Sequence, residues 1–125
     1  MLRHIVLSSA AVTTFAGTAG EAGTTDATGA AARFNQPYGS VLAASTTTPL
    51  YLCDQTNHRI RAVTTPGAAV TTWAGTSSGF VDGTGTTGVK FKYPMDAEHD
   101  ATKAAMFISD RANYRIRRAP GPGLA

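Results

Sequence analysis

The stretch that decides the fold is LYLCDQTNHRIR, residues 50–61. Residues 50–53 and 58–64 are short runs that contain the aliphatic, aromatic and β-branched side chains favoured in strands. The residues between them, DQTN (54–57), are polar. Asp and Asn are typical of tight turns, because their side chains bond nearby backbone N–H groups and tolerate left-handed backbone. The stretch therefore predicts two neighbouring antiparallel strands joined by a short turn.

The same pattern returns later in the chain, so the sequence is built from repeats. Three blocks recur in the same order: DQTNHRIR (54–61) as DRANYRIR (110–117), VTTFAGT (12–18) as VTTWAGT (70–76), and FNQP (34–37) as FKYP (91–94). Their offsets are 56, 58 and 57 residues. A conserved order at a nearly constant period is typical of solenoids, propellers and arrays of modules.

The repeat extends to both ends of the sequence. Residues 2–5 align with residues 60–63, so we expect the chain to begin inside a repeat. The apolar run of residues 5–7 is also shorter than the core of a signal peptide, which needs about 7–15 residues, so we expect a strand here. After the arginine-rich block we expect only a short tail, residues 120–125.

Composition excludes several classes of protein. The chain has 125 residues, a hydrophobic fraction of 42% and a net charge of +3, which argues against a disordered chain and does not by itself indicate nucleic-acid binding. A single cysteine, Cys53, excludes an internal disulfide framework and a zinc site built from cysteines. No apolar run approaches the length of a membrane-spanning helix, so no membrane partner is expected.

The spacing of strand-like runs groups them into sheets. We expect strands at residues 2–7, 12–16, 38–43, 50–53, 58–64, 70–74, 95–99, 104–109 and 114–119. Short turns join neighbouring strands, whereas the stretches 17–37 and 75–94 are long and rich in glycine and small residues. Four antiparallel strands followed by one long crossing, repeated, predict a β-propeller blade.

The order of these blocks resembles the NHL repeat of β-propeller proteins. The matching elements are Val-x-x-Phe/Trp-Ala-Gly, a loop with Gly and Asp, Phe-x-x-Pro, and the block from Asp to Arg, and they run from Leu2 to Arg118. Two features depart from the family pattern. The second copy has Asp96 where the first has Gly39, and the period exceeds the usual length of propeller repeats, about 40–45 residues.

The resemblance implies an all-β fold made of antiparallel four-stranded blades, a partial NHL-type β-propeller. Residues 1–17 would be the last strands of a preceding blade, 18–75 a complete repeat, 76–119 a second, incomplete repeat, and 120–125 a tail. Residues 38–43 and 95–99 would be innermost strands that line the channel, and residues 70–74 an outermost strand.

Two sets of residues are candidates for a role in structure or binding. The expected structural turn residues are Asp54, Asn57, Asp110 and Asn113. The candidate interaction surface consists of the arginines on the third strands: Arg59, Arg61, Arg115, Arg117 and Arg118. Alternation along a strand places Arg59 and Arg61 opposite Ile60. These arginines either pair with turn carboxylates of neighbouring blades and cover a solvated face, or contact RNA phosphates as in some propellers of the family.

Other motifs predict no chemistry. GTGTTG (83–88) fits a dinucleotide-binding pattern, but VKFKYP follows it where a helix would have to begin, so we expect a crossing loop. The aspartates are spread singly over the turns and loops, and the three histidines form no recognisable set of metal ligands. Cys53 is expected to be a small buried residue. We therefore assign no catalytic residue, no metal ligand and no cofactor.

The functional expectation is a non-enzymatic module that binds a protein partner. The alternatives are an RNA-binding propeller surface and the remnant of a metal-dependent propeller lyase or hydrolase. Two blades do not close a ring, so we expect either completion by further repeats or association of copies into a homo-oligomer.

Overall fold

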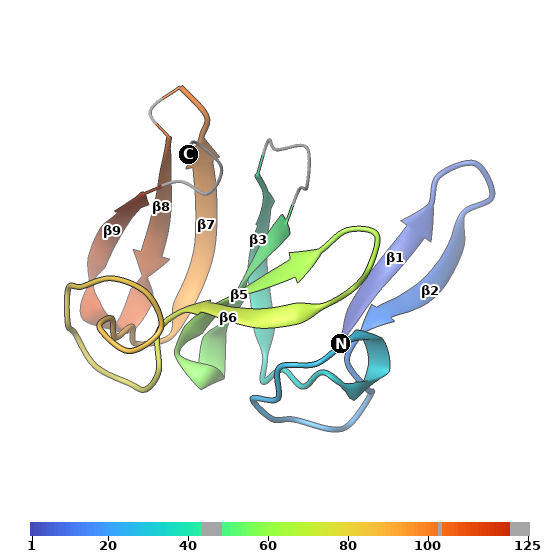
Figure 1. The fold of residues 1–125 in the computed structure, drawn as a ribbon, viewed down its shortest axis with the longest axis horizontal. Coiled ribbons are helices and arrows are strands. Elements are labelled where there is room, and N and C mark those ends of the chain that lie inside the picture. Colours follow the sequence, from blue (N-terminus) through green and yellow to red (C-terminus); the bar gives the residue numbers. More distant parts are fainter. Residues whose placement is uncertain (44–48, 103, 121–125) are drawn as a thin grey trace.

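A computed structural model of the chain describes residues 1–43, 49–102 and 104–120, and these form antiparallel β-sheets (Figure 1). The first sheet has β1 (Leu2–Val6) and β2 (Ala11–Ala16). The second has β3 (Pro37–Leu42), β4 (Pro49–Asp54), β5 (Arg59–Thr64) and β6 (Val70–Ala74). The third has β7 (Pro94–Asp100), β8 (Ala105–Asp110) and β9 (Arg115–Pro120). The all-β class and the antiparallel pairing are confirmed.

Strand positions agree with the sequence prediction to within a residue or two. The main difference is the start of β5 and of β9. His58 and Tyr114 belong to the turns, because each has left-handed backbone, φ 57° and 55°, and ends a short 3-10 helix, Gln55–Asn57 or Arg111–Asn113. The predicted tail lies outside the described residues except for Pro120, which ends β9.

The three sheets stand in a row, with the third at the left and the first at the right of Figure 1. Within the second and third sheets the strands follow chain order, β3-β4-β5-β6 and β7-β8-β9. The two long loops, which join β2 to β3 and β6 to β7, run along the lower end of the sheets in this view. Each loop carries a phenylalanine into the interior, Phe34 in the first and Phe91 in the second.

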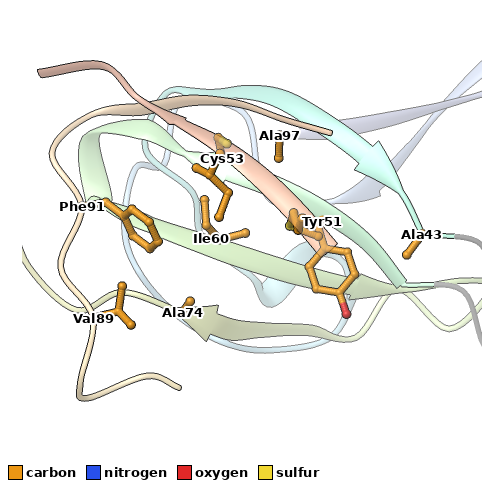
Figure 2. Packing of buried hydrophobic residues seen from close by; sticks show 10 residues of the cluster. Ala43, Tyr51, Cys53, Ile60, Ala74, Val89, Phe91 and Ala97 are labelled. Atoms are coloured by element: carbon orange, nitrogen blue, oxygen red, sulfur yellow. The ribbon is translucent and has the colours of Figure 1, made fainter. Parts of the chain in front are cut away.

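Two apolar cores separate the sheets. Between the first and second sheets lie the buried residues Ala16, Ala32, Phe34, Leu52, Val63 and Val70. Between the second and third lie Ala43, Tyr51, Cys53, Ile60, Ala74, Val89, Phe91, Ala97, Met106 and Ile108. Figure 2 shows Cys53, Ile60 and Tyr51 of the second sheet gathered with Phe91 and Val89 of the loop that leads to the third. Both faces of the second sheet are therefore covered.

The second and third sheets also meet along their first strands, since β3 lies beside β7. Gly39 permits this approach. A methyl group at Gly39 would lie 2.5 Å from the Met95 carbonyl oxygen and 2.7 Å from Asp96 Cα. Gly39 and Asp96 are the equivalent positions at which the two repeats differ, and the structure brings them into contact. The bulkier residue of the second copy is accommodated because the first copy has no side chain there.

The third sheet leaves exposed what the second sheet buries. Ile60 is 0% exposed, whereas its equivalent Ile116 is 70% exposed. Phe107 and Ser109, equivalent to the buried Tyr51 and Cys53, are half-buried. The first sheet shows the converse: Ile5 and Val12 are exposed, whereas their equivalents Val63 and Val70 are buried. Each end of the row thus presents apolar positions that an inner sheet covers.

Candidate functional site

A buried polar network built around Asp54 organises the complete repeat. Asp54 Oδ1 accepts the backbone N–H of Asn35 at 2.7 Å. Its Oδ2 accepts a bond from Asn57 Nδ2 at 2.8 Å and one from Arg61 Nη1 at 2.7 Å. The side chains of Asp54 and Arg61 are both fully buried, so each charge depends on the other and on these hydrogen bonds.

The second repeat has the same network around Asp110. Asp110 accepts the backbone N–H of Lys92 at 2.7 Å and bonds from Asn113 at 2.7 Å and Arg117 at 2.9 Å. Arg61 and Arg117 lie over equivalent phenylalanine rings, 5.1 Å from the Phe34 centroid and 5.3 Å from the Phe91 centroid. The repeat therefore preserves a complete set of side-chain contacts.

Each of these arginines also holds the crossing loop. Arg61 Nη2 donates to the Thr25 carbonyl at 3.0 Å and to Asp26 Oδ1 at 2.6 Å. Asp26 in turn accepts the backbone N–H of Thr72 on β6 at 2.9 Å. In the second copy Arg117 bonds to the Val81 carbonyl and to Asp82. The side chain of Asp82 is 77% exposed, against 45% for Asp26.

The four predicted turn residues all lie at these turns, but the reason differs from the predicted one. Asp54 and Asp110 accept backbone N–H groups 19 and 18 residues earlier in the chain, at Asn35 and Lys92, and within the turn each accepts a side-chain bond from an asparagine, Asn57 or Asn113. The left-handed positions are occupied by His58 and Tyr114 and not by asparagine. These side chains therefore connect the turn to the loop that precedes the sheet.

The predicted arginine surface is corrected for two of its members. Arg61 is fully buried and Arg117 is 10% exposed, because each is enclosed by its carboxylates and by the crossing loop. Their partners are the turn of their own sheet and the preceding loop, and not the turns of neighbouring blades, which one of the alternative interpretations predicts. Arg59 is half-buried and donates to the Thr76 carbonyl at 2.9 Å. Arg115 and Arg118 remain exposed.

An exposed aromatic and arginine group lies at the turn end of the third sheet. We call Phe80, Val81, Tyr114 and Arg115 the Phe80 patch. The Arg115 guanidinium carbon is 3.9 Å from the centroid of the Phe80 ring, and Phe80 is 42% exposed. Tyr114, next to Arg115 in the chain, is 94% exposed. The equivalents in the first repeat are Thr24, Thr25, His58 and Arg59, so the patch is a departure from the repeat.

A cavity of about 460 Å³ lies beside β9. Its walls come from the end of β6, the loop of residues 82–85, and β9 from Arg117 to Pro120. Val89, Phe91 and Ile108 form its apolar floor. The GTGTTG segment is thus part of a loop beside this cavity, and no helix begins after it.

The other candidate residues, Cys53 and His58, make contacts that belong to the packing of the fold. Cys53 is buried, and burial, together with the nearby Asp96 carboxylate, raises the pKa of its thiol to about 12. His58 Nδ1 accepts the backbone N–H of Tyr93 at 3.1 Å, and the two rings meet edge to face. Among the residues that the structure describes, no three His, Cys, Asp or Glu side chains converge as metal ligands would. The described part of the chain has no helix long and apolar enough to cross a membrane.

Two features of the site were missed at the sequence level. Asp26 and Asp82, which complete the arginine networks, are separated by 56 residues, as are Asp54 and Asp110. That equal spacing was a usable signal. Phe80 carried no repeat signal because the first copy has a threonine there.

No protein-family model and no curated protein matches the sequence. Solved structures do match. An auxiliary nutrient-binding protein from Bacteroides ovatus is 25% identical, with a TM-score of 0.81 over 93% of this chain and 31% of its own. A second, from Bacteroides thetaiotaomicron, is 29% identical, with a TM-score of 0.82 over 93% of this chain and 31% of its own.

A third structure shows similarity of fold alone. It is a Bacteroides thetaiotaomicron protein provisionally named a phosphatase, 22% identical, with a TM-score of 0.83 over 93% of this chain and 28% of its own. The chain therefore spans less than a third of the length of each of these three structures.

Proposed function

We propose that the chain is part of an NHL-type β-propeller and acts as a non-enzymatic protein-binding module. The propeller is supported by the same chain-order arrangement of strands in the second and third sheets, by the contact between the first strands β3 and β7, and by the packing of one sheet on the next. The apolar positions left exposed on the first and third sheets support completion of the row by further repeats or by a second copy.

A binding role is supported by the names of two similar structures, both auxiliary nutrient-binding proteins. The observation that carries the protein-binding proposal is the Phe80 patch. Phe80 and Arg115 are in contact and exposed, and Tyr114, next to Arg115 in the chain, is exposed as well. Tyr, Phe and Arg are the residue types enriched at protein interfaces, and Tyr and Arg are enriched at their hot spots. The equivalents of Phe80, Val81 and Tyr114 in the first repeat are threonine, threonine and histidine, so repeat architecture does not require the apolar and aromatic members of the patch.

The alternatives have weaker support. An RNA surface would rest on Arg115 and Arg118, because Arg61 and Arg117 are enclosed. Phe80 could stack on a base, so RNA is included as an outcome of the test. A metal-dependent lyase or hydrolase would need a group of side chains that holds the metal. Within the described residues, no three acidic, histidine or cysteine side chains form such a group.

The test is a selection of peptides from a random phage-displayed library on the purified full chain. Selected peptides are then titrated by calorimetry against wild type, Phe80→Ala and the matched control Thr24→Ala. We expect Phe80→Ala to weaken binding about tenfold or more, as hot-spot truncations do, and Thr24→Ala to leave it unchanged. Circular dichroism melts would check that both variants remain folded.

A single-stranded oligouridine RNA is titrated in parallel at two salt concentrations. Peptides that bind Phe80→Ala as well as wild type would remove the proposed protein site. RNA binding that weakens steeply with salt and with Arg115→Ala would replace it with a nucleic-acid surface.

A further inference from the structure

The outer edge of β9 lacks the neighbour that its equivalent has. In the second sheet, β5 pairs with β4 on one side and with β6 on the other. In the third sheet, β9 pairs with β8, and among the described residues no strand pairs with its other edge. The cavity lies along this edge.

The apolar part of the cavity is the counterpart of a filled place in the second sheet. Val70 of β6 is buried in a cluster formed by Ala16, Ala32, Phe34, Leu52 and Val63. The repeat offsets convert these five residues into Ala74, Val89, Phe91, Ile108 and Ala119. All five of these line the cavity. The cavity therefore reproduces the surroundings of Val70 with no valine in them.

The polar groups that hold β6 also have counterparts at the cavity. The Ala27 carbonyl accepts the Val70 N–H at 2.9 Å, and the Asp26 carboxylate accepts the Thr72 N–H at 2.9 Å and its hydroxyl at 3.1 Å. The equivalents are Gly83 and Asp82, which both line the cavity. Arg117 already holds one oxygen of Asp82, as Arg61 holds Asp26.

We infer that β9 and the cavity form a binding site for an added β-strand whose sequence follows that of β6, with a valine or similar apolar side chain seated in the cavity. The register follows from the second sheet, where Val63 pairs with Val70 and Arg61 with Thr72. The valine of the added strand would lie opposite Ala119, and its threonine opposite Arg117 and within reach of Asp82. Pairing of the backbones supplies affinity, and the fit of the valine side chain in the cavity supplies specificity, as in other cases of strand addition.

The inference goes beyond the proposed function, since it does not involve the Phe80 patch. The test uses a fluorescein-labelled peptide AAVTTWAGT, the sequence of residues 68–76, titrated with the purified full chain by fluorescence anisotropy. We expect saturable binding. A peptide with Asp in place of the valine should bind at least tenfold more weakly, because it would bury a carboxylate among apolar side chains.

Two chain variants locate the site. Ala119→Trp fills the cavity and should abolish binding of the valine peptide, and Asp82→Ala should weaken it. Leu7→Ala, at an exposed position in the β1–β2 hairpin, is the control that should leave binding unchanged. If Ala119→Trp unfolds the chain, hydrogen exchange of wild type decides: the peptide should protect backbone amides of β9.

Three results would overturn the inference. These are absence of binding at millimolar peptide, equal binding of the valine and aspartate peptides, and protection of amides elsewhere than β9. Sedimentation velocity gives a supporting result. Self-association that Val12→Asp abolishes and that the peptide competes away would show that β2 of a second copy, whose sequence VTTFAGT follows that of β6, supplies the added strand.

Discussion

Arg61 and Asp54 form an ion pair with an N–O distance of 2.7 Å, and neither side chain has any exposure to water. Arg61 reaches Asp26 in the crossing loop at the same time, so one guanidinium joins the turn, the loop and the sheet. A buried pair of this kind is costly to break, because removal of one partner leaves the other charge buried and unbalanced.

Arg61→Met should therefore destabilise the chain by about 3–5 kcal/mol, the range seen when one partner of a buried pair is removed. Arg117→Met should cost less, because Arg117 is partly exposed and its second partner, Asp82, is mostly in water. Urea unfolding of both variants measures the difference. Equal losses of unfolding free energy in the two variants would contradict this prediction, because they would show that solvent exposure at the third sheet does not stabilise the carboxylates left without their arginine.

Substitution of the equivalent isoleucines should have opposite effects. Ile60→Asp places a carboxylate in the core between two sheets and should unfold the chain, whereas Ile116→Asp alters an exposed position and should leave it folded. Ile116→Asp should also reduce any concentration-dependent association, because it removes an apolar contact from an uncovered sheet face. Circular dichroism and light scattering measure the two effects. An Ile116→Asp variant that unfolds would contradict this account of the third sheet.

Cys53 should be unreactive in the native state. Its thiol is buried and its pKa is raised to about 12, so at pH 8 the thiolate that reacts with disulfide reagents is nearly absent. The rate of reaction with a colorimetric disulfide reagent should rise as urea separates the second and third sheets. Cys53→Ser provides the blank. Fast reaction without denaturant would show that the interface opens readily.

His58 should make stability depend on pH. Burial lowers the pKa of His58 below 6.5, as do Lys92 and Arg59, although Asp110 opposes this. The folded state thus binds a proton less readily than the unfolded state, so the contribution is complete above about pH 6.5 and is lost as the pH falls through the lowered pKa. Protonated Nδ1 also cannot accept the Tyr93 N–H.

We expect the melting temperature of the wild type to fall between pH 7.5 and pH 5 by more than that of His58→Asn. Asparagine tolerates the left-handed backbone of this position and does not titrate. Parallel melts at the two pH values measure the effect. Identical pH profiles for the two proteins would remove His58 as the titrating group.

Much of the fold could be predicted from the sequence because its signals are local and occur twice. Runs of β-forming residues, polar turns and the long glycine-rich crossings fixed the strand positions to within a residue or two. Where His58 and Tyr114 were placed in strands, the error came from the turn. Left-handed backbone at these residues is set by the closing 3-10 helix and not by their own preference.

The position of the arginines could not be derived from alternation. Period-two alternation shows which side chains share a face of a strand, but not whether another layer covers that face. The second sheet is covered on both sides, so Arg61 is enclosed although it lies opposite Ile60. One of the two carboxylates that balance the Arg61 charge, Asp26, lies 35 residues away in a loop for which local patterns predict no regular structure.

The Phe80 patch was missed for a different reason. Comparison of the two copies draws attention to what they share, and those shared residues hold the architecture. Phe80 stands where the first copy has Thr24, and Tyr114 where it has His58. The exposed side chains of Phe80 and Tyr114 are not fixed by the shared architecture, so a search for what the copies share passes over them.

Each of the two crossing loops is held by side-chain contacts at two points, and the number of residues between these points differs between the loops. The carboxylates Asp26 and Asp82 hold one end, and the buried residues Ala32 and Val89 hold the other. The second loop has one residue more between these points, yet the strands on either side match. The tip around Gly85 can therefore accept inserted sequence without a change of register in the sheets. It offers a place to graft a foreign peptide, and because Gly85 lines the cavity, such a graft would reshape its wall.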